Sequence, residues 1–179
     1  EHHGSDPTHP FFMYIAYNAP HMPHQAKPND MAKYKGRYAA GWDAFRQSRL
    51  KRQHELGILD THHVLGQLPD GISAWDDLRA EKKELFSAYM ELYAGLVDNI
   101  DQNVGRVVEF LKQSGQIENT IIVLSSDNGA NAVGGLDGTP NSLGTREGLM
   151  ATPEQALALA REGRLGSRET STMYPVGWT

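Results

Sequence analysis

The feature that most constrains the fold of this chain is a long helical pattern between residues 80 and 113. Apolar and aromatic side chains recur there at steps of three and four, which is the spacing of one buried helix face. The members of this stripe are Leu85, Tyr89, Leu92, Leu96, Ile100, Val104, Val107 and Leu111. We therefore predict a helix over Ala80–Gln113 that packs one face against the rest of the chain, with Gly115 ending it.

Two apolar runs flank this helix and predict strands. Residues 11–17 read FFMYIAY and residues 120–124 read TIIVL. Neither run alternates with polar residues, which is typical of strands covered on both faces of a parallel sheet. A strand, a helix and a second parallel strand would form a right-handed crossover. With 179 residues and 39% hydrophobic content, we expect one domain of α/β class.

Polar side chains follow both runs where each predicted strand ends. Pro20 blocks continuation of the first strand and places His21 just beyond it. Asp127 and Asn128 follow the second run and offer a charged and a neutral oxygen, which suit Ca²⁺ or Mg²⁺. Ligand sites of open α/β sheets collect at the carboxyl ends of strands, so we predict that these residues share a pocket. An ordinary Asp-Asn-Gly turn and a buried structural histidine are the alternatives.

Other clusters of ionisable residues favour structural interpretations. His62 and His63 are adjacent in a loop rich in Gly, Pro and Asp, and we expect exposed loop histidines because neighbours in sequence point in different directions. Asp98 and Asp101 lie one turn apart on the predicted helix. We expect them to be solvated or paired with a neighbour such as Arg106.

Composition excludes several classes of function. The net charge of -5 gives no general attraction to nucleic acid or to an anionic membrane. The absence of cysteine excludes disulfides, thiolate nucleophiles and Cys-ligated zinc within this sequence. No apolar run approaches the roughly 20 residues of a membrane helix. The cellular location stays open.

Taken together, the segments resemble a known family. PFFMYIAYNAPHMPHQA, MELYAGLVDNIDQNVGRVVEFLKQSG and TIIVLSSDNGA occur in this order, followed by SLGTRE and YPVGW, and they closely resemble the central part of the formylglycine-dependent, arylsulfatase-like sulfatases. The combination of NAPH with a later SSDNGA is far more specific than either motif alone.

The resemblance implies a fold, an activity and site residues. It implies part of the three-layer sandwich of the alkaline-phosphatase superfamily, with a mainly parallel sheet flanked by helices. It implies a sulfatase that cleaves the sulfate monoester of a small molecule or carbohydrate, using a formylglycine nucleophile and Ca²⁺, with Mg²⁺ or Mn²⁺ as alternatives. By position, Asp127 and Asn128 match metal ligands, and His21 matches the histidine that contacts sulfate and protonates the leaving group. It also suggests a periplasmic or secreted protein.

The sequence lacks several residues of the family pattern: the nucleophile, the early Asp-Asp metal pair, the Lys and His that follow the nucleophile, and the Lys expected soon after YPVGW. The nucleophile arises from Cys or Ser in a C/S-x-P-x-R motif, and no such motif occurs in residues 1–179. We therefore expect residues 1–179 to be the central portion of a sulfatase catalytic domain that is inactive alone and self-associates through exposed sheet edges. A phosphomonoester or phosphonate hydrolase of the same superfamily and a non-catalytic binding module are the alternatives.

Overall fold

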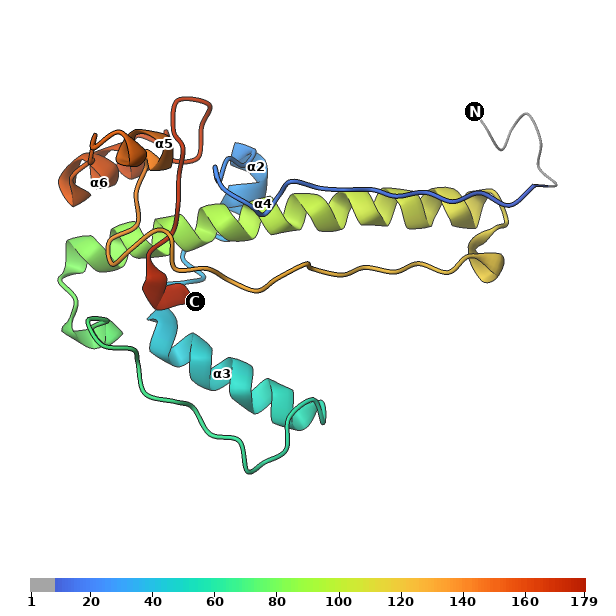
Figure 1. Ribbon diagram of the computed structural model, residues 1–179, viewed down its shortest axis with the longest axis horizontal. Coiled ribbons are helices and arrows are strands. Elements are labelled where there is room, and N and C mark those ends of the chain that lie inside the picture. The colour runs from blue at the N-terminus through green and yellow to red at the C-terminus, as the bar shows by residue number, and fades with distance from the viewer. Residues whose placement is uncertain (1–8) are drawn as a thin grey trace.

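The computed structural model describes residues 9–179, apart from the side chain of Arg146. Its helical segments, in chain order, are α2 (Pro28–Ala32), α3 (Gly41–Glu55), the 3-10 turn Trp75–Asp77, α4 (Ala80–Gln113), the 3-10 turn Ile117–Asn119, α5 (Ser142–Arg146), α6 (Pro153–Arg161) and the 3-10 turn Val176–Trp178. The long helix α4 forms the axis of the molecule, and the other helices gather around its amino-terminal half (Figure 1).

The predicted helix over Ala80–Gln113 is confirmed with the same bounds. Every member of its predicted apolar stripe is buried or half-buried. The helix ends at Gly115, whose φ of 71° is the left-handed conformation that glycine adopts easily. The amide of Gly115 donates to the Lys112 carbonyl and that of Gln116 to the Leu111 carbonyl. This Schellman arrangement satisfies the carbonyl groups of the last turn.

An aromatic core lies against the first half of α4. Trp42 at the start of α3 is 4.9 Å from Trp75 and 5.7 Å from Trp178, measured between ring centroids, and meets both edge to face. The Trp178 indole N–H donates to the carbonyl of Phe86 on α4 at 3.0 Å. Edge-to-face contacts add to the stability that burial of these large rings provides. The core therefore joins α3, α4 and the carboxyl-terminal residues.

Helix α2 is fixed to α4 by a close backbone approach and a buried carboxylate. A Cβ on Gly95 would lie 2.8 Å from the Met31 amide nitrogen, so only glycine permits this approach. Asp30 accepts hydrogen bonds from Asn99 at 2.9 Å and Gln102 at 2.8 Å. Helix α2 begins at Pro28, whose fixed φ suits the first turn of a helix.

The predicted strands are extended but do not form a sheet. Within residues 9–179, β-pairing is limited to the isolated bridges His24–Thr172, Thr139–Met173 and Asn141–Ser171. The prediction of burial on both faces is wrong for these runs: the exposed fraction is 92% for Phe12 and 93% for Ile121. A strand becomes buried only when a neighbour about 4.8 Å away takes up its backbone groups, and these runs have no such neighbour. The three-layer sandwich is therefore not confirmed.

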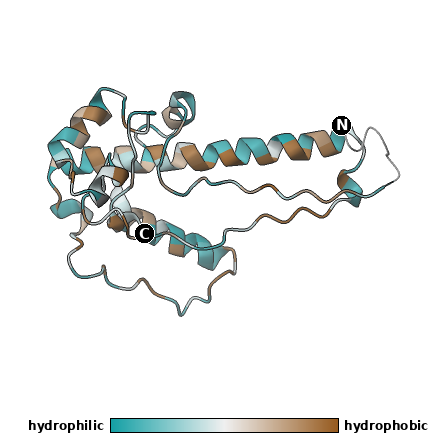
Figure 2. Ribbon diagram, turned by 45° about the horizontal axis from the view of Figure 1, so that its top comes forward, coloured by the Kyte–Doolittle hydropathy of each residue, from teal (hydrophilic) through white to brown (hydrophobic). Residues whose placement is uncertain are grey.

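The direction of the two runs nevertheless matches the expected topology. Both lie along the carboxyl-terminal half of α4 and both run opposite to it, so they run parallel to each other (Figures 1 and 2). Both runs contain mostly apolar residues, whereas hydrophilic and hydrophobic residues alternate along α4 beside them (Figure 2). The polar residues that follow each run therefore come after a stretch that runs toward the amino-terminal half of α4.

Candidate functional site

His21 lies on an exposed turn that follows the first extended run. Its amide donates to the Asn18 carbonyl at 2.9 Å, which closes the turn. The ring Nδ1 lies 2.7 Å from the Met22 carbonyl oxygen. Because a carbonyl oxygen only accepts, Nδ1 carries a proton and the tautomer of the neutral ring is fixed.

Asp127 and Asn128 lie on an exposed bend after the second extended run. The Asn128 side-chain amide donates to the Gly129 carbonyl at 2.9 Å, and the Ser126 hydroxyl donates to the Asn128 carbonyl at 2.6 Å. With its N–H₂ group engaged, Asn128 presents its amide oxygen as the remaining acceptor. Both residues therefore offer oxygen atoms, the donor type that Ca²⁺ and Mg²⁺ prefer.

These side chains do not make a complete metal site by themselves. No group of three or more His, Asp or Glu side chains placed to hold an ion occurs in the described part of the chain. No hydrogen bond joins His21 to Asp127 or Asn128 there. Because Ca²⁺ takes about six to eight oxygen ligands, the two residues fit a part of a coordination shell. The predicted pocket shared by the three residues stays a prediction.

His24, which sequence reasoning did not single out, is the buried histidine of this region. Its exposed fraction is 2%. The ring stacks on Tyr174 at 5.2 Å and meets Tyr93 of α4 edge to face at 5.3 Å. Its pKa is lowered to about 4, mainly because burial in this cage disfavours the charged ring; a hydrogen bond to the Pro20 backbone opposes this shift and the nearby His21 adds to it. The only sequence feature that could have drawn attention to His24 is that it is the second histidine of the segment APHMPH.

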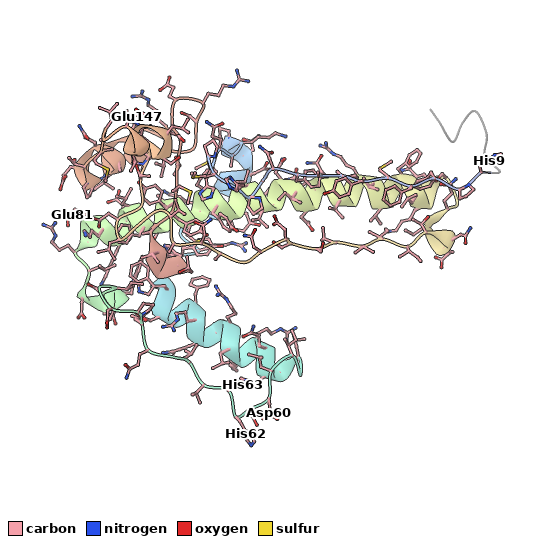
Figure 3. The ribbon with its side chains drawn as sticks, viewed as in Figure 1. His9, Asp60, His62, His63, Glu81 and Glu147 are labelled. Carbon is pink, nitrogen blue, oxygen red and sulfur yellow. The ribbon has the colours of Figure 1, made fainter. Side chains whose placement is uncertain are left out.

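The other candidates have structural roles. His62 and His63 lie with Asp60 at the tip of the loop after α3, away from both extended runs, as expected of loop histidines (Figure 3). Asp98 bonds to Lys33 at 2.5 Å and to Gln102 at 2.7 Å. The suggested partner Arg106 instead donates to Asn103. The positive charge paired with Asp98 therefore comes from Lys33 rather than from Arg106.

A sizeable cavity in the described part of the chain does not coincide with the predicted site. It has a volume of about 710 Å³ and lies between α2, α4 and α6, where Gln25–Pro28 form part of its wall. His21, Asp127 and Asn128 do not line it. In residues 9–179, no helix has the length and apolar character needed to cross a membrane.

Comparison with known proteins identifies the family. The sulfatase family profile matches residues 3–158. The chain is 40% identical over 121 residues to an uncharacterized sulfatase of Schizosaccharomyces pombe, and the aligned residues make up 67% of this chain and 22% of the relative. It is 34% identical over 126 residues to the arylsulfatase of Klebsiella aerogenes, covering 70% of this chain and 27% of the relative. The chain therefore belongs to the sulfatase family.

A further relative indicates the wider superfamily. A multifunctional alkaline phosphatase superfamily protein of Trinickia caryophylli is 30% identical over 125 residues, covering 67% of this chain and 23% of the relative. In each of these relatives, the aligned part is about a quarter of the protein. The recognised resemblance to a sulfatase of the alkaline-phosphatase superfamily is thus confirmed.

Proposed function

We propose that this chain is the central portion of a sulfatase that hydrolyses sulfate monoesters to an alcohol or phenol and sulfate. The observation that carries the proposal is the sulfatase match over residues 3–158, which includes the NAPH and SSDNG segments in their expected order. The substrate class is a small-molecule or carbohydrate sulfate ester. The net charge of the chain is -5, so nucleic acid is not a proposed partner.

His21 is proposed as the proton donor to the leaving group. Cleavage of the S–O bond leaves negative charge on the ester oxygen, and a proton from the imidazolium Nε2 converts that oxygen to a hydroxyl. The exposed position of His21 and the Nδ1 contact to the Met22 carbonyl at 2.7 Å support this role. A histidine suits it because its ordinary pKa lies near neutral pH.

Asp127 and Asn128 are proposed as two of the ligands of a divalent ion, with Ca²⁺ as the first choice and Mg²⁺ or Mn²⁺ as alternatives. When bound, such an ion supplies positive charge that neutralises sulfate oxygens. Their adjacent exposed oxygens and their place after a parallel-directed extended run support the assignment. The remaining ligands and the formylglycine nucleophile are proposed to come from parts of the parent protein outside residues 1–179.

Parts of the parent protein outside residues 1–179 would also explain the two exposed extended runs. We propose that residues 11–17 and 120–124 become strands of a mainly parallel sheet when the rest of the catalytic domain is present, giving the α/β sandwich. Their parallel direction beside α4 supports this (Figure 1). The exposed apolar side chains of both runs, among them Phe12 and Ile121, would then be covered.

The proposed function is tested with the parent protein and a pair of esters of one phenol. We expect kcat/KM for 4-nitrophenyl sulfate to exceed that for 4-nitrophenyl phosphate, with phosphate esters as the competing assignment because of the superfamily relative. Turnover of the phosphate ester alone would contradict the proposal. Chelation followed by addition of Ca²⁺ then tests the metal: activity is expected to fall and to return.

The site residues are tested by single substitutions in the parent protein. We expect Asp127→Ala to lower sulfatase activity and raise the Ca²⁺ concentration needed for half-maximal activity, because a charged ligand is lost. His21→Ala is expected to lower kcat by about 10²–10⁴-fold for the sulfate ester of a simple alcohol, whose leaving oxygen needs a proton from a general acid. Asp101→Ala serves as the control, since Asp101 is exposed on α4 and distant in sequence from both motifs. Unchanged Ca²⁺ dependence in Asp127→Ala would refute its assignment.

A further inference from the structure

We propose that His24 is a positioning residue that holds the turn bearing His21, an inference that rests on the proposed role of His21 as proton donor. His24 lies three residues after His21 in the same proline-flanked loop. It does not lie on the exposed turn and has no direct part in the chemistry. Its role is to fix where that turn can be.

The cage around the His24 ring is built by two distant parts of the chain. Tyr93 comes from the middle of α4 and Tyr174 from the carboxyl-terminal segment, and the two tyrosine rings meet each other edge to face at 5.1 Å. His24 stacks on one and points an edge at the other, at 5.2 Å and 5.3 Å. The ring of His24 therefore holds the loop against both α4 and the carboxyl-terminal segment.

Backbone hydrogen bonds extend the same attachment along the loop. The His24 amide donates to the Thr172 carbonyl at 2.9 Å, and the Ala26 amide donates to the Gly166 carbonyl at 3.2 Å. Between them, the Gln25 side-chain amide donates to the Thr170 carbonyl at 2.8 Å. Residues 166–172 therefore form a frame for residues 24–26. His24 is the only one of these three loop residues that is buried, so its ring is the anchor of the frame.

The cage also requires a neutral ring. The groups that face it are the phenol rings of Tyr93 and Tyr174, the paired Thr172 and, from its own loop, His21 and the Pro20 carbonyl. None of these carries a negative charge near neutral pH that would stabilise an imidazolium. The His24 Nδ1 is buried without a hydrogen-bond partner in the described part of the chain. A neutral aromatic ring of similar size should therefore replace it, while a small or flexible side chain should not.

The test compares His24→Ala and His24→Phe in the parent protein. Hydrogen–deuterium exchange measures how firmly the loop peptide around residues 18–26 is held, and kcat is measured for sulfate esters whose leaving groups range from 4-nitrophenol to a simple alcohol. In His24→Ala we expect exchange in this peptide to be about tenfold faster. We expect kcat to fall by about tenfold or more for the alcohol ester but by less than about threefold for 4-nitrophenyl sulfate, which scarcely needs the proton.

His24→Phe is expected to restore both the exchange and the kcat pattern to within about threefold, and His63→Ala in the loop after α3 is the control that alters neither. Should His24→Ala not fold, Gln25→Ala removes one bond of the same frame and is expected to show the same pattern at smaller size. Equal losses for all leaving groups, or unchanged exchange, would overturn the inference. A parent protein that hydrolyses no sulfate ester would refute the proposed function itself, and that outcome is recognised from the unsubstituted protein before any variant is made.

Discussion

The neutral imidazole of His24 makes the stability of this chain depend on pH. In the folded chain, burial lowers its pKa from 6.5 to about 4, whereas the unfolded chain keeps the ordinary value. Between these two values the unfolded state binds more protons, so the free energy of unfolding falls as the pH falls. The contribution is fully present above about pH 6.5 and lost toward pH 4.

We expect the free energy of unfolding to fall by about 2 kcal/mol more in the unsubstituted chain than in His24→Phe between pH 7 and pH 4.5, because phenylalanine does not titrate. Urea unfolding followed by tryptophan fluorescence measures this difference, since all three tryptophans lie in the core. Other carboxylates titrate in both proteins and cancel in the comparison. Equal losses in the two proteins would show that His24 is already charged or exposed.

At the scale of secondary structure, the attachment of α2 to α4 depends on the Asp30 carboxylate. Hydrogen bonds from Gln102 and Asn99 lower its pKa, and Lys33 contributes to the same effect, so the group stays charged in its buried position. Asp30→Ala would remove the acceptor of the Asn99 side-chain amide and one of the two acceptors of Gln102, which also donates to Asp98. We expect a loss of about 2–4 kcal/mol in the free energy of unfolding.

Urea unfolding of Asp30→Ala measures this loss, and Asp101→Ala is the control, because the two acidic residues have opposite environments. Asp30 is buried with an exposed fraction of 5%, whereas Asp101 is exposed on α4. The control is expected to change stability by less than about 0.5 kcal/mol. A similar small change in Asp30→Ala would mean that α2 is held by the backbone contact at Gly95 alone.

The helices were predictable from the sequence because their signals are local. The stripe of α4 and the stop at Gly115 depend on residues a few positions apart, and both are confirmed. Thr152 likewise caps α6, where it forms a capping box with Gln155. Burial of the two extended runs depends on neighbouring strands that their own sequences do not encode. Their apolar patterns therefore predicted an extended backbone correctly but could not predict whether a sheet forms. The cage of His24 joins residues 24, 93 and 174, which no local pattern relates.

For the molecule as a whole, we predict that the extended runs form an association surface. They expose unpaired backbone beside large apolar side chains such as Phe12 and Ile121, and such edges pair with other chains. We therefore predict that the isolated chain forms dimers or larger species. Light scattering should detect them, and Phe12→Lys with Ile121→Lys should restore the monomer by adding charge.

Leu56→Lys is the matched control for association, because Leu56 is also exposed, at 54%, but follows α3 rather than an extended run. It should leave the size distribution unchanged. A monodisperse monomer of the unsubstituted chain would contradict the prediction.

We expect the catalytic site to be incomplete within residues 1–179, and an assay of residues 1–179 alone tests this expectation. His21, Asp127 and Asn128 are present, but no complete group of metal ligands occurs in residues 9–179 and the sequence contains no cysteine. The direct measurement is release of 4-nitrophenol from 4-nitrophenyl sulfate by this chain, with Ca²⁺ and with chelator. We expect no release above the protein-free blank in either condition, and Ca²⁺-dependent turnover by residues 1–179 would contradict this expectation.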